Sequence, residues 1–200
     1  MNSRHLENVV DKKLKTIEKN PGPRITVART SQNMFLGDST IAEIENPLWS
    51  IRAIHGGRPA DLTAWVREEP TMLRGVTNVV ILCGGNQVCN KRREGEQNPP
   101  PPPPTAPERT FEAMMDLVDA IREFSNAKVT VIGVPKRLYA LPTEIEYMGD
   151  FNERLKNGAG HYNFIGTGKT MSSDSCYEED GVHLTPTGIG RLASLLRKTL

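Results

Sequence analysis

The chain has 200 residues, of which 37% are hydrophobic, and a formal net charge of +1, which suits one domain with a well-buried core. A net charge near zero gives no electrostatic argument for nucleic-acid binding. No apolar run approaches the length needed to span a bilayer, which is about eighteen residues. The three cysteines are irregularly spaced, predict neither a disulfide framework nor a zinc site, and favour a reduced, intracellular and cytoplasmic setting.

Residues 1–24 are predicted to form an appendage to the main domain, which covers residues 25–200. Apolar residues recur at helical spacing from Leu6 to Ile17, and the turn sequence Asn20-Pro21-Gly22-Pro23 ends this helix. The appendage lacks the apolar stretch of a signal peptide. A short helix packed on the domain is the simpler expectation, and a partner-binding or coiled-coil segment is the alternative.

The rest of the chain alternates between apolar strands and amphipathic helices. The predicted strands cover residues 34–36, 51–54, 76–82, 129–134 and 162–165, and the predicted helices cover residues 60–69, 108–124, 143–157 and 187–199. This alternation predicts an α/β fold with a mainly parallel, five-stranded sheet and right-handed crossovers.

A proline-rich loop is predicted at residues 97–107, around six consecutive prolines at Pro99–Pro104. Such a run adopts the extended polyproline conformation and does not join a helix or a central strand. It is interpreted as a solvated insertion, with an SH3 or WW ligand as the alternative.

Three polar or glycine-containing turns follow predicted strands, at Ser39, Gly57 and Asn86. In parallel α/β sheets, ligands bind beyond the carboxyl ends of the strands. We therefore expect these three residues to meet at one edge of the sheet.

A nucleophile and its base are predicted from two separate segments. Ser39 stands in a Gly-Asp-Ser turn, and Asp180 and His183 are spaced so that the carboxylate can orient the imidazole. The free imidazole nitrogen would then accept the proton of the Ser39 hydroxyl. The alternatives are that Ser39 only caps a helix and that Asp180 and His183 are ordinary turn and cap residues.

Three donors are predicted for a developing oxyanion: the backbone amides of Ser39 and Gly57 and the side-chain amide of Asn86. Gly57 has the alternative role of a turn residue with positive φ, and Asn86 that of a plain turn residue. Arg58 and Arg137 are candidates to meet a phosphate or carboxylate of a substrate, although surface placement is the simpler expectation.

These segments, in this order, resemble the blocks of the SGNH (GDSL) hydrolase superfamily. The match comprises Phe35-Leu36-Gly37-Asp38-Ser39, Gly57, Asn86, and Asp180 with His183. The resemblance implies a flavodoxin-like, three-layer α/β/α sandwich without metal or organic cofactor. It also implies a serine esterase that hydrolyses short acyl, acetyl or lipid acyl esters through a Ser-His-Asp triad and an acyl-enzyme.

Gln87 departs from the family pattern, which usually has aspartate there, and is expected to disturb the hydrogen bonding of the turn more than the chemistry. A weaker resemblance concerns residues 17–23, which are similar to the ending of ribosome-skipping peptides found before domains of some LINE-type retrotransposons. Some of these elements encode an SGNH esterase. A helix-ending turn is the other interpretation of residues 17–23, and a binding or scaffold module with little hydrolytic activity is the alternative function.

Overall fold

A computed structural model describes residues 23–26, 31–42, 44, 48–89 and 106–197. The helix predicted within the appendage of residues 1–24 and the proline run Pro99–Pro104 lie outside the described residues. The predicted proline-rich loop ends one residue too late, because Pro107 is already the first residue of a helix.

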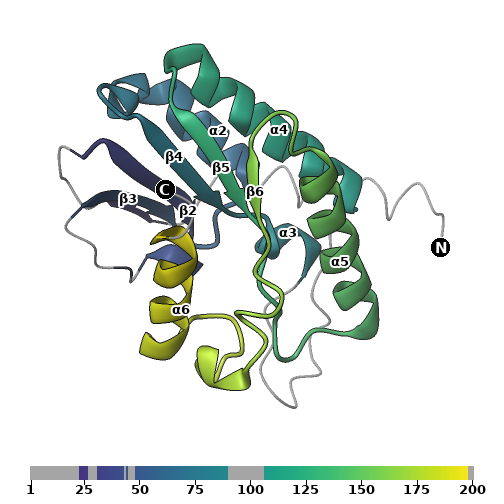
Figure 1. Cartoon of the computed structure of the whole chain (residues 1–200). Helices are drawn as coiled ribbons and strands as arrows, with labels where there is room; N and C mark the ends of the chain where they lie inside the picture. Colours follow the sequence, from purple (N-terminus) through teal and green to yellow (C-terminus); the bar gives the residue numbers. More distant parts are fainter. Residues whose placement is uncertain (1–22, 27–30, 43, 45–47, 90–105, 198–200) are drawn as a thin grey trace.

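The described residues form a six-stranded sheet in the order β1-β3-β2-β4-β5-β6 (Figure 1). The strands are β1 (Arg24–Thr26), β2 (Asn33–Asp38), β3 (Trp49–Ile54), β4 (Asn78–Leu82), β5 (Lys128–Ile132) and β6 (Asn163–Ile165). All neighbouring strands are parallel except β1, which pairs antiparallel with β3. The predicted α/β fold with a mainly parallel sheet is confirmed.

Among the described strands, β1 is the one that the sequence did not predict, and it contains the proposed domain boundary at residue 24. Arg24 lies opposite Ile54 in the register, and the burial of β1 is low at both of its ends. Its three residues are too few to show a period. The Arg24 guanidinium lies 5.2 Å from the centre of the Trp65 ring and pairs with Glu68 at 2.8 Å, so contacts far along the chain hold this strand.

In the described part of the chain, four long helices flank the sheet, and each begins with a proline. They are α2 (Pro59–Glu68), α4 (Pro107–Phe124), α5 (Pro142–Asn157) and α6 (Pro186–Arg197). Proline suits the first helical position because its fixed φ is already helical and its missing N–H has no partner to lose there. All four begin within one residue of the predicted helices, and residues 198–199 of the last predicted helix lie outside the described residues. No described helix is long and apolar enough to cross a membrane.

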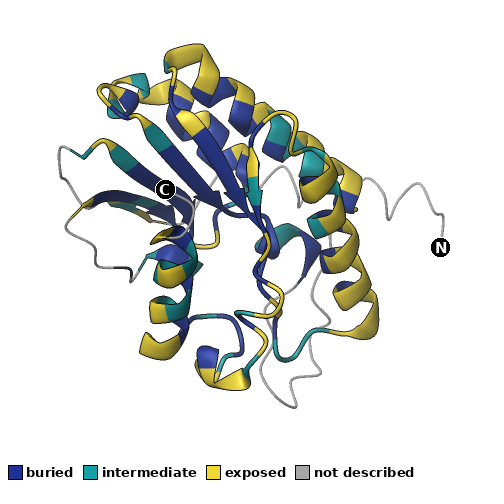
Figure 2. Cartoon of the chain, in the orientation of Figure 1, coloured by how far each residue is buried: buried dark blue, intermediate teal, exposed yellow. Residues whose placement is uncertain are grey.

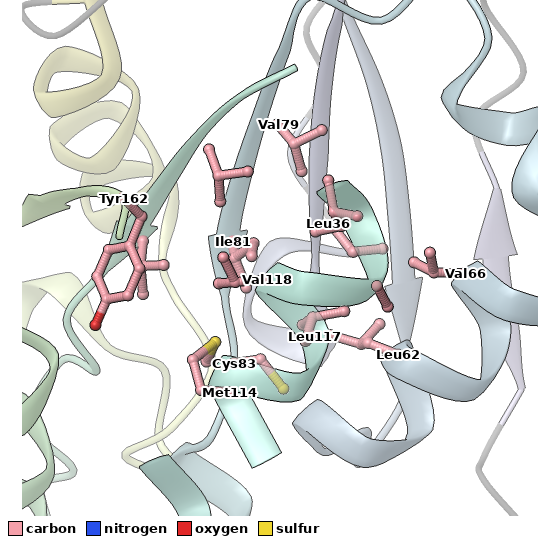
Figure 3. Packing of buried hydrophobic residues seen from close by; sticks show 14 of the residues in the cluster. Leu36, Leu62, Val66, Val79, Ile81, Cys83, Met114, Leu117, Val118 and Tyr162 are labelled. Carbon is pink, nitrogen blue, oxygen red and sulfur yellow. The ribbon is translucent and has the colours of Figure 1, made fainter. Parts of the chain in front are cut away.

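The side chains of the central strands β2, β4 and β5 alternate between two apolar clusters, one on either face of the sheet. In β4, Val79 and Ile81 join the cluster that contains residues of α2, α4 and α5, whereas Val80 and Leu82 join the cluster that contains Leu192 of α6. Figure 3 shows residues of the first cluster, and Figure 2 shows that the central strands are mostly buried. This double burial explains why β4 is an almost continuous apolar run.

The strand order reverses its direction between β2 and β4. From β2 the chain continues to β3 on one side, and from β4 it continues to β5 on the other. Such a reversal opens a crevice at the carboxyl ends of the two adjacent strands. Ser39 directly follows β2, and Asn86 lies in the one-turn helix α3 (Gly85–Val88) that follows β4.

Candidate active site

Ser39 begins a short 3-10 turn, Ser39–Ile41, at the carboxyl end of β2. The cap of this turn is Asp38, whose Oδ1 accepts a hydrogen bond from the Thr40 amide at 2.9 Å. The Ser39 hydroxyl instead lies 3.2 Å from Nε2 of His183, 144 residues further along the chain. The side chain of Ser39 is therefore directed to the histidine, and its neighbour does the capping.

Asp180 and His183 lie on one tight turn before α6. Nδ1 of His183 is 2.5 Å from Oδ2 of Asp180. The other oxygen of Asp180, Oδ1, accepts hydrogen bonds from the backbone amides of Val182 and His183, each at 2.9 Å. The backbone of the turn thus fixes the carboxylate of Asp180, and the carboxylate fixes the imidazole of His183. This leaves Nε2 directed at Ser39. The exposed fractions of the two side chains are 20% and 29%, so the pair is open to a substrate.

Asp38 is a second carboxyl group close to the site. It is 3% exposed, and burial raises its pKa, an effect partly opposed by the hydrogen bond from Thr40 and by electrostatic interactions with Arg137 and His183. Asp38 accepts its hydrogen bond from Thr40, and of the two carboxylates it is Asp180 that contacts the imidazole ring. Asp38 contributes charge beneath the site rather than orientation of the base.

Gly57 lies in the turn after β3, and both of its backbone polar groups have partners. Its amide donates to the Ile54 carbonyl at 2.9 Å, and its carbonyl accepts from Nδ2 of Asn86 at 3.3 Å. The positive φ of this turn belongs to Gly56, at 66°, and not to Gly57 as the turn interpretation had it. A Cβ on Gly57 would lie 2.7 Å from Cβ of Ile54, so close packing requires glycine there. The role of Gly57 as an oxyanion donor stays a prediction.

Asn86 lies in the first turn of α3, which follows β4 at the same edge of the sheet as Ser39. Its Oδ1 accepts from Nη2 of Arg137 at 2.7 Å, while its Nδ2 donates to Gly57. An amide nitrogen carries two hydrogens, so one of them remains for a further acceptor. The adjacent Gln87 has its Oε1 buried without a hydrogen-bond partner among the described residues, and its expected effect on the turn stays a prediction.

Arg137 was expected at the surface, and that expectation is wrong. The residue is 8% exposed and lies in the loop after β5. Besides Asn86, its guanidinium bonds the Cys89 carbonyl at 2.9 Å. The signal available in the sequence was its position just beyond the carboxyl end of a strand, at the same edge as Ser39 and Asn86.

The arrangement brings a hydroxyl, an imidazole and a carboxylate into one hydrogen-bonded chain. Such a chain can move the proton of the hydroxyl to the imidazole while the carboxylate stabilises the resulting imidazolium. Within the described ranges, no group of three or more histidine, cysteine, aspartate or glutamate side chains has the arrangement of a metal site.

No protein-family model and no curated protein sequence matches the chain. Several solved structures do match it. A lipase, Lip_vut3, from a goat rumen metagenome is 16% identical with a TM-score of 0.65, over 84% of this chain and 97% of that one. The acetyl-xylooligosaccharide esterase Axe2 from Geobacillus, in a mutant form, is 15% identical with a TM-score of 0.62, over 87% and 95%.

A lipase/acylhydrolase from Enterococcus faecalis is 20% identical with a TM-score of 0.57, over 84% of this chain and 93% of that one. At these identities the similarity is one of fold. The fold expected from the SGNH resemblance is confirmed: the chain has the α/β architecture of lipases and esterases.

Proposed function

We propose that this protein is a serine esterase that hydrolyses carboxylic esters, with Ser39 as nucleophile, His183 as general base and Asp180 as the group that orients the base. The observation that carries the proposal is the pair of hydrogen bonds in series, 3.2 Å from Ser39 to His183 and 2.5 Å from His183 to Asp180. The segments that supply them are 144 residues apart, so the alignment is not a by-product of one local turn.

The reaction proceeds in two halves. His183 takes the proton of the Ser39 hydroxyl while Oγ of Ser39 attacks the carbon of the ester carbonyl. The protonated imidazole then gives this proton to the departing alcohol. Ser39 is left as an acyl ester. His183 next takes a proton from water, whose oxygen attacks the acyl carbon, and returns the proton to Ser39 as the carboxylic acid leaves.

The negative charge on the carbonyl oxygen needs donors, and we assign them to the Ser39 amide, the Gly57 amide and Nδ2 of Asn86. The Gly57 amide is bonded to Ile54 in the free protein, so we expect substrate to share or displace that bond. Hydrogen bonds of this kind are often loose or differently aligned before substrate binds. Each such donor typically contributes about 3 to 4 kcal/mol to the transition state.

The substrate class we propose is a carboxylic ester with a short acyl, acetyl or lipid acyl group. The support is at the level of fold, from structures described as a lipase, an acylhydrolase and an acetyl-xylooligosaccharide esterase. Partner binding by the proline run Pro99–Pro104 and a retroelement origin of the chain stay predictions from the sequence.

The test is hydrolysis of p-nitrophenyl acetate, butyrate and octanoate by the wild type and by Ser39→Ala. We expect Ser39→Ala to lose about a thousandfold or more in kcat while it keeps its folding transition. Ser194→Ala is the matched control, because that serine only bonds the Gly190 carbonyl on the exposed side of α6. The profile across the three acyl lengths measures the size of the acyl site.

Normal turnover by Ser39→Ala would overturn the assignment. If the wild type hydrolyses none of the three esters, labelling with a phosphonate ester decides between the two functions. Labelling that depends on Ser39 would support the esterase with a narrower substrate, and absence of labelling would favour a binding or scaffold module.

A further inference from the structure

We propose that Arg137 is a positioning residue for the esterase reaction: it holds the Asn86 carboxamide so that its N–H groups, and not its oxygen, face the substrate. This inference rests on the proposed function. Its basis is the bond of 2.7 Å from Nη2 of Arg137 to Oδ1 of Asn86, on the side of the amide away from Gly57.

The chemistry of the two side chains fixes the direction of this contact. A guanidinium only donates hydrogen bonds, so the atom of Asn86 that meets it must be the carbonyl oxygen. The amide nitrogen then points the other way, where it meets the Gly57 carbonyl at 3.3 Å. The bond to Arg137 is the shorter one and is charge-assisted, so it contributes more to the orientation than the bond to Gly57.

The guanidinium of Arg137 is held in place by hydrogen bonds to both ends of the one-turn helix α3. Nη1 donates to the carbonyl of Cys89, which follows α3, and Nη2 donates to Asn86 in its first turn. A Cβ added to Gly85 would lie 3.0 Å from Nη2, so the guanidinium packs directly on this helix. The nearby charge of Asp38 offsets part of the cost of burying the cation.

The loop that carries Arg137 also contacts the turn that carries the base. The Leu138 amide donates to the Gly181 carbonyl at 3.0 Å, between Asp180 and His183. Gly181 has a φ of 67°, and a Cβ there would lie 2.8 Å from the Tyr139 ring, so the two segments are closely packed. One loop therefore fixes the position of the oxyanion side of the site (Gly57 and Asn86) relative to its base side (Ser39, Asp180 and His183).

A residue that acts by orienting a transition-state donor affects kcat more than KM. We expect Arg137→Met to lower kcat on a p-nitrophenyl ester by about tenfold to a hundredfold, with KM changed by less than about threefold, since loss of the donor itself costs about 10²–10³. Arg137→Lys keeps the charge and one donor direction and should recover part of the loss.

The decisive experiment is a double-mutant cycle with Asn86→Ala. If Arg137 acts through Asn86, then Arg137→Met in the Asn86→Ala background costs less than about threefold in kcat. Arg154→Met is the matched control, because that arginine forms surface ion pairs with Glu108 and Asp150. Thermal unfolding is measured for every variant, and if Arg137→Met does not fold, Arg137→Lys replaces it in the same cycle.

An equal loss in both backgrounds would overturn the proposal, and so would an effect confined to KM, which would place Arg137 on the substrate instead. The Ser39→Ala comparison is made first on the same ester. Absence of Ser39-dependent turnover in the wild type would show the failure of the proposed function itself, whereas Ser39-dependent turnover that is insensitive to Arg137→Met would overturn only the role of Arg137.

Discussion

The two halves of the site differ in how firmly the free protein has arranged them for the reaction. On the side of the proposed base, Asp180, His183 and Ser39 already form the hydrogen bonds that the proposed proton transfer requires. On the oxyanion side, the Gly57 amide donates a hydrogen bond to the Ile54 carbonyl. The side-chain amide of Asn86 donates one of its hydrogens to the Gly57 carbonyl. In the proposed mechanism, the base side is therefore arranged before substrate binds, whereas the donors of the oxyanion side are shared with the backbone.

The difference follows from how each half is built. The orienting contact of the base side spans three residues and is made within one turn, so local geometry alone secures it. The donors come from the ends of three separate strands, and their alignment depends on side-chain contacts such as that of Arg137. We therefore expect substitutions to have large effects on the base side and smaller, coupled effects on the oxyanion side.

The largest effect is expected when the base is removed. His183→Gln keeps a polar side chain but cannot take the Ser39 proton, so kcat should fall by about 10³–10⁴ with folding retained. The measurement is kcat on p-nitrophenyl acetate, beside thermal unfolding. The exposed His161 provides the matched control, His161→Gln, and a kcat for His183→Gln within tenfold of that control would contradict the role of His183.

A smaller loss is expected on the oxyanion side. Asn86→Ala removes one donor and leaves the base intact, so kcat should fall by about 10²–10³ and remain above that of His183→Gln. Initial rates at saturating ester measure it, with Asn157→Ala at the end of α5 as the control. If Asn86→Ala were as inactive as His183→Gln, the division of the site into a ready half and a shared half would be wrong.

The smallest effect concerns Asp38, whose charge lies near both His183 and Arg137. Burial raises its pKa in the folded state, so the folded protein holds this proton more tightly than the unfolded chain. Stability is therefore lost as pH rises from the unfolded pKa through the raised folded pKa. Asp38→Asn has no such charge and can still accept from the Thr40 amide.

We expect the free energy of unfolding of Asp38→Asn, relative to the wild type, to increase with pH across that window and to be constant outside it. Urea denaturation at a series of pH values measures the difference. Asp119→Asn, on the exposed face of α4, controls for the substitution itself. A difference that grew as the pH fell would show that the carboxylate is favoured in the folded state, against the expectation.

Sequence patterns predicted the parts of the molecule that depend on local or short-range physics. Apolar runs gave the five parallel strands, and the spacing of Asp180 and His183 indicated a base with its orienting group. The sequence missed β1, because three residues show no period and their pairing with β3 is non-local. It placed Arg137 at the surface, because a cation after a strand is usually solvated and the acceptors that bury it lie in a distant segment.

The turn after β3 shows a second limit. Two consecutive glycines, Gly56 and Gly57, offered no way to tell which one has the positive φ and which one packs on Ile54. Nor does a motif show whether an amide is already bonded within its own turn. These properties depend on the path of the backbone, which only the assembled sheet determines.

The long separation between Ser39 and His183 has a consequence for biosynthesis. A nascent chain that has emerged from the ribosome through β6 holds every described strand and the serine, but the turn with Asp180 and His183 has yet to be made. Domains fold as synthesis proceeds from the N-terminus. Under the proposed mechanism, Ser39 therefore has no base while the sheet assembles beside the ribosome, and it gains one only once the segment that leads into α6 has folded back onto the sheet.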